Sequence, residues 1–552
     1  MKKICKLLGF LLVACLAASS QPLHNKHAFT HQDTLRGSIT PERAWWDVQR
    51  YDIRVRPDYA ARSIEGQVTI TYRVVAPCQG NACSLMQIDL QQPLEITRIE
   101  DGARTSRPFT REGNVFHVSM GKSRQNETGQ LTIFYRGNPR IAVNPPWDGG
   151  WIFTRDAKGR PWMTVACQGL GASVWYPCKD HQSDEPDQGA SLSIEAPDSL
   201  VAVGNGRLKE KQPAGPGYTR WTWEVKNPIN NYDIIPYIGY YVNWTETYAG
   251  EKGPLDCSYW VLDYDLEKAK KQFTQVKDML KCFEYWMGPY PFYEDSYKLV
   301  ETPHLGMEHQ SAVAYGNKFM DGYLGMDLSG TGWGKKWDYI IVHESGHEWF
   351  GNNLTTKDIA DMWIHEGFTD YTETLFVECQ YGKEAADAYT QGLRASIQNN
   401  SPVIGPYGVN QEGSGDMYNK GNNLLHMVRQ LIGDDDVFRQ ILRGLNKDFY
   451  HQTVTSRQVE DYISRKSGKD LSRVFDQYLR TANIPVLEYR IDGQDLSYRW
   501  THCIDGFDMP VRLSDHSWLK PTTDWQKVPV TENTRDGLSV DRNFYIQVKR
   551  LE

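Results

Sequence analysis

The chain has no basic tract, no internal repeat, no low-complexity linker and no apolar run long enough to cross a membrane as a mature helix. Its formal net charge is −8, which argues against nucleic acid as a partner. No cysteine spacing resembles a Cys-based zinc site. What is present, 40% hydrophobic and 24% charged residues over 552 positions, is typical of a soluble protein with sizeable cores. The length suggests about three domains.

The pattern of residues 1–20 predicts a secretion signal, because basic residues precede an apolar run over 7–14 and small residues follow it. Two processing routes remain open. The run ends at Cys15 in a pattern similar to a bacterial lipobox, in which Cys15 would be lipidated and would anchor the chain to a membrane. Alternatively, an ordinary signal peptidase would cut after residues 18–20. Either route exports the mature protein to the periplasm, to the outer membrane as a lipoprotein, or to the medium.

Ten cysteines are present, and two of them lie in the predicted signal. An oxidising compartment permits disulfides among the other eight. Cys78 with Cys83, and Cys167 with Cys178, are close enough in sequence to close small loops. Buried free thiols are an equally good reading of several of these cysteines, so the connectivity stays open.

Three regions with different patterns of polar and apolar residues follow the signal. Residues 21–250 alternate in polarity and are rich in β-branched residues with turns at Pro, Gly and Asn, which predicts a large β domain. Residues 251–485 contain helical patterns, and residues 486–552 return to short alternating segments that suggest a small C-terminal β module. The expected helices cover residues 266–286, 363–380, 383–399, 420–432, 437–445, 457–468 and 471–479, together with a helix through 343–347.

The strongest functional signal is His343-Glu344-Ser345-Gly346-His347, followed 19 positions later by Glu366. Two histidines four residues apart lie on one helix face, so their ring nitrogens can converge on one metal ion. Glu366 supplies a third ligand, which leaves a tetrahedral zinc with one open position for water. Two histidines and a carboxylate also suit iron or cobalt, so the metal is not fixed by the ligands alone. We expect one Zn²⁺ per chain.

Glu344 lies between the two histidines, where it can take a proton from the zinc-activated water as general base. The alternative is a solvated helix turn with no metal. The apolar residues that surround the motif, from Trp337 to Val342 and then Trp349-Phe350, argue against that alternative. A buried helix does not carry two His and two Glu without partners.

At this point the sequence resembles a known family, the gluzincin zinc aminopeptidases of the aminopeptidase-N and leukotriene-hydrolase type, as a bacterial, exported member. Besides the zinc motif and Glu366-Gly-Phe, Leu305-Gly306-Met307-Glu308-His309 stands where the family carries Gly-x-Met-Glu-Asn, and Tyr418-Asn419-Lys420-Gly421 where it carries Tyr-x-Lys-Gly. The resemblance implies a multi-domain fold: a β-rich N-terminal domain, a thermolysin-like α+β zinc catalytic domain and the small C-terminal β module.

The resemblance also implies roles for residues outside the zinc motif. Tyr418 would donate a hydrogen bond to the oxyanion, and Glu308 would bind the α-ammonium group of the substrate. Met307 and Gly306 would line the first pocket, and Gln168 would contact the substrate backbone or amine. A structural ion pair is the alternative for Glu308, and simple core packing is the alternative for Tyr418.

Some positions depart from the family or remain undecided. Leu305 and His309 replace the family Gly and Asn, and His309 would change the pH dependence or narrow the pocket for the amino end. Asp361 would either orient a zinc-bound histidine ring or cap a loop. His304 and His365 are expected to be packed or solvent-facing rather than extra ligands.

Together these features predict a zinc-dependent aminopeptidase that hydrolyses N-terminal residues from oligopeptides. A zinc endopeptidase or another hydrolase on the same site, such as an epoxide hydrolase, is one alternative. A peptide-binding relative without turnover is another, against which the intact Glu344, Glu366 and Tyr418 argue.

Overall fold

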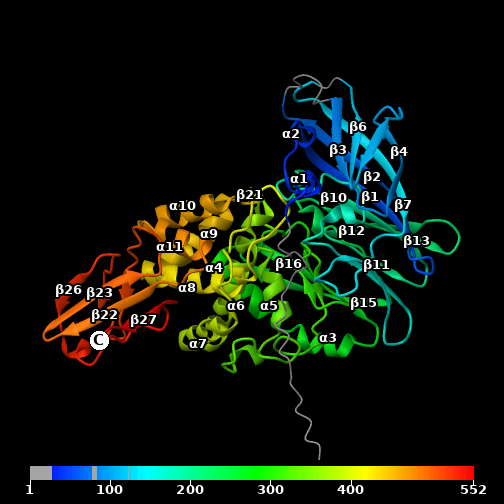
Figure 1. Cartoon of the computed structure of the whole chain (residues 1–552). Helices are drawn as coiled ribbons and strands as arrows, with labels where there is room; N and C mark the ends of the chain where they lie inside the picture. The colour runs from blue at the N-terminus through cyan, green and yellow to red at the C-terminus, as the bar shows by residue number, and fades with distance from the viewer. Residues whose placement is uncertain (1–27, 77–83, 122–123) are drawn as a thin grey trace, which may run out of the picture.

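The computed structural model describes residues 28–76, 84–121 and 124–552. The chain forms three parts in sequence order: a β-rich N-terminal domain, a central domain of mixed strands and helices, and a β module at the C-terminal end (Figure 1). The predicted signal with Cys15, and the Cys78–Cys83 pair, lie outside the described residues. Within the described ranges, no helix is both long and apolar enough to span a membrane.

The N-terminal domain is built on a seven-stranded sheet in the order β12-β13-β10-β1-β2-β7-β4. The β1–β2 hairpin forms its centre, and burial alternates along β1 because successive side chains face opposite sides of the sheet. Two short helices, α1 (His31–Gly37) and α2 (Pro41–Ala44), precede it. The seven strands are β1 (Trp46–Asp58), β2 (Ser63–Val74), β4 (Glu95–Asp101), β7 (Thr128–Gly137), β10 (Ala190–Pro197), β12 (Arg207–Pro213) and β13 (Tyr218–Val225).

Two smaller sheets complete this domain. One has the order β11-β14-β9-β8 and the other β3-β6-β5. Their strands are β3 (Leu85–Asp89), β5 (Phe109–Glu112), β6 (Val115–Ser119), β8 (Gly150–Arg155), β9 (Pro161–Ala166), β11 (Val201–Val203) and β14 (Tyr237–Gly239). The loop after β9 carries Gln168 toward the central domain, and the 3-10 turn η3 (Asn231–Asp233) lies before β14.

The central domain begins with a five-stranded sheet in the order β15-β16-β17-β19-β18. Its strands are β15 (Tyr241–Gly250), β16 (Gly253–Leu262), β17 (Tyr297–Glu301), β18 (Gly306–Met307) and β19 (Val313–Tyr315). The sequence-based boundary between residues 250 and 251 is therefore misplaced, because it cuts the turn of the β15–β16 hairpin. β16 pairs with β17, so the whole hairpin belongs to the central domain, which begins near Tyr241. The polarity alternation simply continues across the true boundary.

Helices follow the sheet, largely where the sequence predicts them. The predicted 363–380 helix is α6 (Trp363–Tyr381), whereas 266–286 splits in two and 383–399 ends early. The helices are α3 (Leu266–Gln272), α4 (Gln275–Met287), α5 (Tyr339–Gly346), α6, α7 (Lys383–Leu393), α8 (Asn419–Ile432), α9 (Asp435–Asp448), α10 (Ser456–Ser467) and α11 (Ser472–Arg480). Two short strands, β20 (Leu354–Thr356) and β21 (Gln452–Val454), pair in parallel beside them.

The central sheet separates two hydrophobic cores. Along β17, Leu299 packs in the core of the helical part, whereas Val300 packs in the core of the N-terminal domain. Along β19, Val313 and Ala314 divide in the same way. Because neighbouring residues of a strand face opposite sides, one face of the sheet covers the helices and the other face is covered by the N-terminal domain.

The C-terminal module begins at Val486, as the sequence predicts, and forms a four-stranded sheet in the order β26-β23-β22-β27. Its hydrophobic residues join the core of the helical part. The strands are β22 (Val486–Asp492), β23 (Asp495–Thr501), β26 (Gln526–Pro529) and β27 (Gln547–Arg550), with a separate pair β24 (Val511–Arg512) and β25 (Trp518–Leu519).

One disulfide is formed among the described residues, and the sequence did not identify it. Cys282 of α4 is joined to Cys379 near the end of α6, across 97 residues. Cys167 and Cys178 are instead buried free thiols, so the small loop that their spacing allows is not closed. The disulfide ties α6 to the helix that packs beside it.

Candidate metal centre and active site

The two motif histidines are presented by α5 and the residue that ends it. Asp338 starts the helix by accepting hydrogen bonds from the backbone of Ile340 and Ile341. His343 lies in the last turn, and His347 follows as the C-cap residue, still in right-handed helical conformation. Their ring centroids are 5.0 Å apart. The i, i+4 spacing therefore places both rings on one side of α5.

Glu366, in the first turn of α6, completes a triad with these histidines. Its Oε2 lies 3.6 Å from Nε2 of His343 and 3.4 Å from Nε2 of His347. All three donor atoms lie within 4.8 Å of one another and are buried. Glu366 Oε2 accepts no hydrogen bond from the described residues, although it is buried. Two imidazoles and a carboxylate that face one point, with an unsatisfied oxygen, fit a zinc ion.

The other ring nitrogens of the histidines are held by partners outside the triad. Nδ1 of His343 lies 2.6 Å from Oε1 of Glu373, whose Oε2 accepts a hydrogen bond of 2.6 Å from Tyr389. Nδ1 of His347 lies 3.1 Å from the carbonyl of Phe350. An Nδ1–H bound in this way leaves Nε2 as the lone-pair donor toward a metal.

Asp361 does not orient a histidine ring. Its carboxylate accepts hydrogen bonds from Ser456 and from Tyr407 and therefore fixes a loop, which is the second of the two roles that the sequence left open. Glu373 is the orienting carboxylate, and sequence reasoning missed it. It lies seven residues after Glu366 on α6, two helical turns along the same face, and that spacing is the signal that could have found it.

Glu344 lies beside the triad and next to β18. A Cβ at Gly306 would come within 2.6 Å of its Oε1, so the edge strand approaches this carboxyl only because residue 306 is glycine. Burial raises the pKa of Glu344 to about 7. A carboxyl with this pKa exchanges a proton readily near neutral pH.

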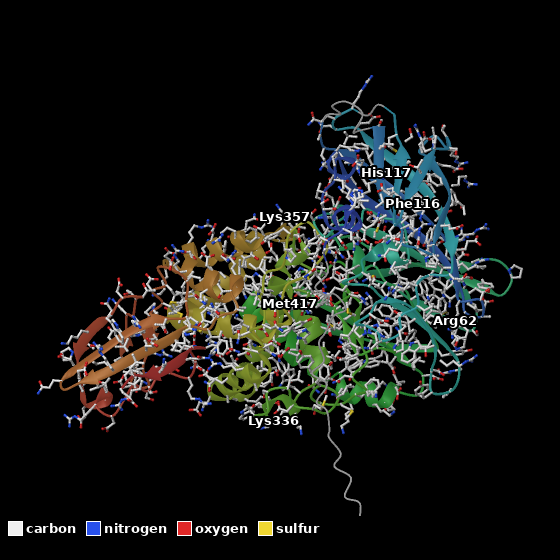
Figure 2. All side chains as sticks on the ribbon, viewed as in Figure 1. Arg62, Phe116, His117, Lys336, Lys357 and Met417 are labelled. Atoms are coloured by element: carbon white, nitrogen blue, oxygen red, sulfur yellow. A yellow bond between two sulfur atoms is a disulfide. The ribbon has the colours of Figure 1, made fainter. Side chains whose placement is uncertain are left out.

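Tyr418 is brought to the site by a close crossing of α6 and α8. A Cβ at Gly421 would come within 2.8 Å of the Cα of Gly367. The two glycines let the helix backbones touch, and Tyr418, the N-cap residue of α8, stacks on the ring of His343 with centroids 6.2 Å apart. Met417, the residue before it, lies deep inside the central domain (Figure 2).

Glu308 follows β18 and is 2% exposed. Its Oε1 accepts hydrogen bonds from Gln168 Nε2 and from the Tyr232 hydroxyl, at 2.5 and 2.9 Å. Neither lysine nor arginine forms an ion pair with this carboxyl in the described ranges, so the structural ion pair considered from the sequence is absent. Burial raises the pKa of Glu308 above its ordinary value.

Leu305 and His309, which depart from the family pattern, lie in different surroundings. Leu305 lines the cleft beside Gly306. His309 faces the N-terminal domain instead, where its Nδ1 lies 2.5 Å from the hydroxyl of Tyr237, and it does not line the cleft. The expectation that His309 narrows the amino-end pocket is therefore wrong. His365 is packed, with Nε2 accepting from the backbone of Thr356.

All nine residues proposed from the sequence line one cleft of about 1230 Å³: Gln168, Gly306, Met307, Glu308, His343, Glu344, His347, Glu366 and Tyr418. Its walls come from the N-terminal domain near Trp147, from the loop around Met326 and from the long segment 396–419. Eight carboxyl groups line it, and none of the described lining residues is Lys or Arg. The carboxyl residues are Asp148, Glu308, Asp327, Glu344, Glu366, Asp370, Glu412 and Asp416.

Comparison with known protein families gives two matches. The Peptidase family M1 domain matches residues 264–478, and the Peptidase M1 N-terminal domain matches residues 48–232. Aminopeptidase M1-B of Oryza sativa subsp. japonica is 23% identical over 518 residues, which cover 89% of this chain and 56% of that protein. Aminopeptidase B of Mus musculus is 24% identical, over 85% of this chain and 74% of that protein. The chain therefore spans about half the length of the Oryza sativa aminopeptidase.

Solved structures show the same fold. An M1 zinc metallopeptidase from Deinococcus radiodurans superposes with a TM-score of 0.66 at 20% identity, over 80% of this chain and 96% of that one. A mutant of an M1 zinc metallopeptidase from Deinococcus radiodurans, bound to a Tyr-Ser-Ala substrate, superposes with a TM-score of 0.65 at 21% identity. That comparison covers 79% of this chain and 95% of the other.

The orienting role of Glu373 gives a prediction for metal affinity. Glu373→Gln removes the carboxylate that holds His343 Nδ1, so the affinity for zinc should fall by about 10- to 100-fold in a competition titration with a chelator. Asp361→Asn is the matched control, since its carboxylate contacts a serine and a tyrosine but no ligand. Equal losses in both variants would contradict the assignment.

The contact between Gly306 and Glu344 gives a second prediction. Gly306→Ala places a methyl group against the Glu344 carboxyl, so peptide turnover should fall by roughly 100-fold while the zinc content stays at that of the wild type. Gly102→Ala serves as control, because a Cβ there meets nothing closer than 3.8 Å. Unchanged turnover in Gly306→Ala would show that the carboxyl need not occupy this position.

Proposed function

This chain belongs to peptidase family M1, and from that membership and the site geometry we propose that it is a zinc-dependent aminopeptidase acting on oligopeptides. The named relatives are aminopeptidases, and one similar structure carries a peptide substrate, which supports the substrate class. The observation that carries the exopeptidase assignment is Glu308, a buried carboxyl beside the triad that forms no ion pair with lysine or arginine among the described residues.

His343, His347 and Glu366 are the residues that would hold the zinc ion. Bound zinc supplies Lewis-acid chemistry: it polarises the scissile carbonyl and makes water a nucleophile near neutral pH. Glu373, through His343, keeps the donor nitrogen turned toward the metal.

Glu344 and Tyr418 are the proposed catalytic groups. Glu344 takes a proton from the attacking water and passes it to the leaving amine, a task suited to a carboxyl whose pKa is about 7. Tyr418 donates its hydroxyl proton in a hydrogen bond to the developing oxyanion, on the side of the cleft where it stacks with His343.

Glu308 is the proposed anchor for the amino end of the substrate. A free α-ammonium group is mostly charged at neutral pH, and it would pair with this buried carboxyl. An internal peptide segment lacks that charge and would not form this ion pair. Gln168, Met307 and Gly306 lie around this position and would contact the first residue. We also propose export from the cytoplasm, on the pattern of residues 1–20 alone.

The direct test compares a free octapeptide with its N-acetylated form, with and without a metal chelator, by mass spectrometry. We expect a ladder of products shortened one residue at a time from the amino end of the free peptide. Acetylation or chelation should abolish the ladder. Glu344→Gln should slow it by about 100- to 10,000-fold while retaining zinc. Internal cuts in both peptides would contradict the exopeptidase assignment.

The composition of the cleft lining gives a prediction about substrate charge. Apart from the triad and its neighbours, Asp148, Asp327 and Asp416 add carboxyl groups to the cleft lining and no lysine or arginine does, so cationic peptides should be favoured. Octapeptides with Lys, Gln or Glu at the third position should rank in that order in kcat/KM. We expect roughly a tenfold spread at low salt that collapses at about 1 M salt, where the Debye length is about 3 Å. A spread that is indifferent to salt would contradict an electrostatic origin.

A further inference from the structure

The carboxyl that would bind the substrate amine is held from the N-terminal domain. Both hydrogen bonds to the Glu308 side chain from the described residues go to Oε1, one from Tyr232 and one from Gln168. Neither donor belongs to the central domain that carries the zinc triad. Gln168 has a role implied by the family resemblance, whereas Tyr232 was one of 31 tyrosines with no signal attached.

We propose that Tyr232 is a positioning residue for recognition of the substrate amino end. This inference rests on the proposed aminopeptidase function. The Tyr232 hydroxyl, 2.9 Å from Oε1, fixes the rotation of the Glu308 carboxyl and directs Oε2 toward the substrate amine. Tyr232 acts through Glu308 and does not itself contact the reacting atoms.

The turn that carries Tyr232 is anchored independently of Glu308. The hydroxyl of Tyr176 donates to the carbonyl of Asn231, and the amide of Asn231 donates to the carbonyl of Lys179. Tyr232 itself is 4% exposed. Its hydroxyl is therefore held at a fixed place before any substrate arrives, which is the condition for a preorganised binding group.

A second property suits Tyr232 to this task. A phenolic hydroxyl can donate a hydrogen bond to the carboxyl without adding a positive charge. A lysine or arginine at the same place would neutralise Glu308 and would compete with the substrate ammonium. Tyr232 thus orients the carboxyl and leaves its charge available to the amine.

The test is Tyr232→Phe in the full chain, which removes one hydroxyl and keeps the buried ring. Loss of a hydrogen bond to a group that anchors the substrate in both the ground and the transition state acts on KM. We expect KM for the free octapeptide to rise roughly tenfold. The value of kcat should stay within about twofold of the wild type, and the zinc content should be unchanged.

Tyr176→Phe is the matched control. It removes a buried hydroxyl that contacts the same turn at the carbonyl of Asn231 but does not contact Glu308. The Asn231 side-chain amide still holds the turn through the carbonyl of Lys179, so KM should stay within about twofold of the wild-type value. If both variants raise KM equally, the effect is a general loosening of the turn and the inference is overturned.

A double-mutant cycle with Glu308→Gln decides whether Tyr232 acts through the carboxyl. With Glu308 already neutralised, Tyr232→Phe should change KM no further, whereas multiplying effects on KM would overturn the inference.

Failure of this inference can be distinguished from failure of the proposed function. Chelator-sensitive trimming by the wild type with a normal KM in Tyr232→Phe overturns only the role of Tyr232. Absence of trimming by the wild type overturns the proposed function, and this inference with it.

Discussion

The contact between α6 and α8 at Gly367 and Gly421 is the constraint on which the active site depends. α6 carries the candidate metal ligand Glu366 in its first turn, and α8 begins directly after Tyr418, so the separation of the two helices sets the distance from the proposed oxyanion donor to the triad. A single methyl group at either glycine would meet backbone atoms of the other helix. Gly367 and Gly421, which follow Glu366 and Lys420, belong to the motifs that resemble the family. They also allow the backbones of the two helices to touch.

The site also depends on a concentration of buried ionisable groups, which is unfavourable for stability unless each has a partner. The buried histidines and carboxylates of the site differ in the partners that they have. His343 and His347 are held through Nδ1, whereas Glu366 Oε2 remains unsatisfied within the described protein. Glu308 accepts hydrogen bonds from the neutral side chains of Gln168 and Tyr232. Glu366 and Glu308 are the groups that the proposed reaction would pair with a metal and with a substrate amine.

The sequence predicted what is local or strongly patterned. The histidine spacing, Glu366 and the helix that carries it, and the sequence of β, mixed and β parts are all present in the structure. Contacts between residues far apart in the sequence could not be predicted. The Cys282–Cys379 disulfide and the Tyr232–Glu308 hydrogen bond are two examples, because no periodicity connects these residues. The boundary near residue 250 was misplaced because a hairpin of the central sheet has the same alternation as the strands before it.

The two-sided packing of the central sheet bears on how the molecule is assembled. Since Val300 and Ala314 belong to the core of the N-terminal domain, the zinc-bearing part has no closed surface of its own on that side. A fragment beginning near Tyr241 would present a bare apolar sheet to water and would aggregate rather than behave as a minimal protease. The N-terminal domain is therefore half of an inseparable folding unit. The rim of the cleft is formed by loops from both domains, near Trp147 and around Met326, and by the segment 396–419.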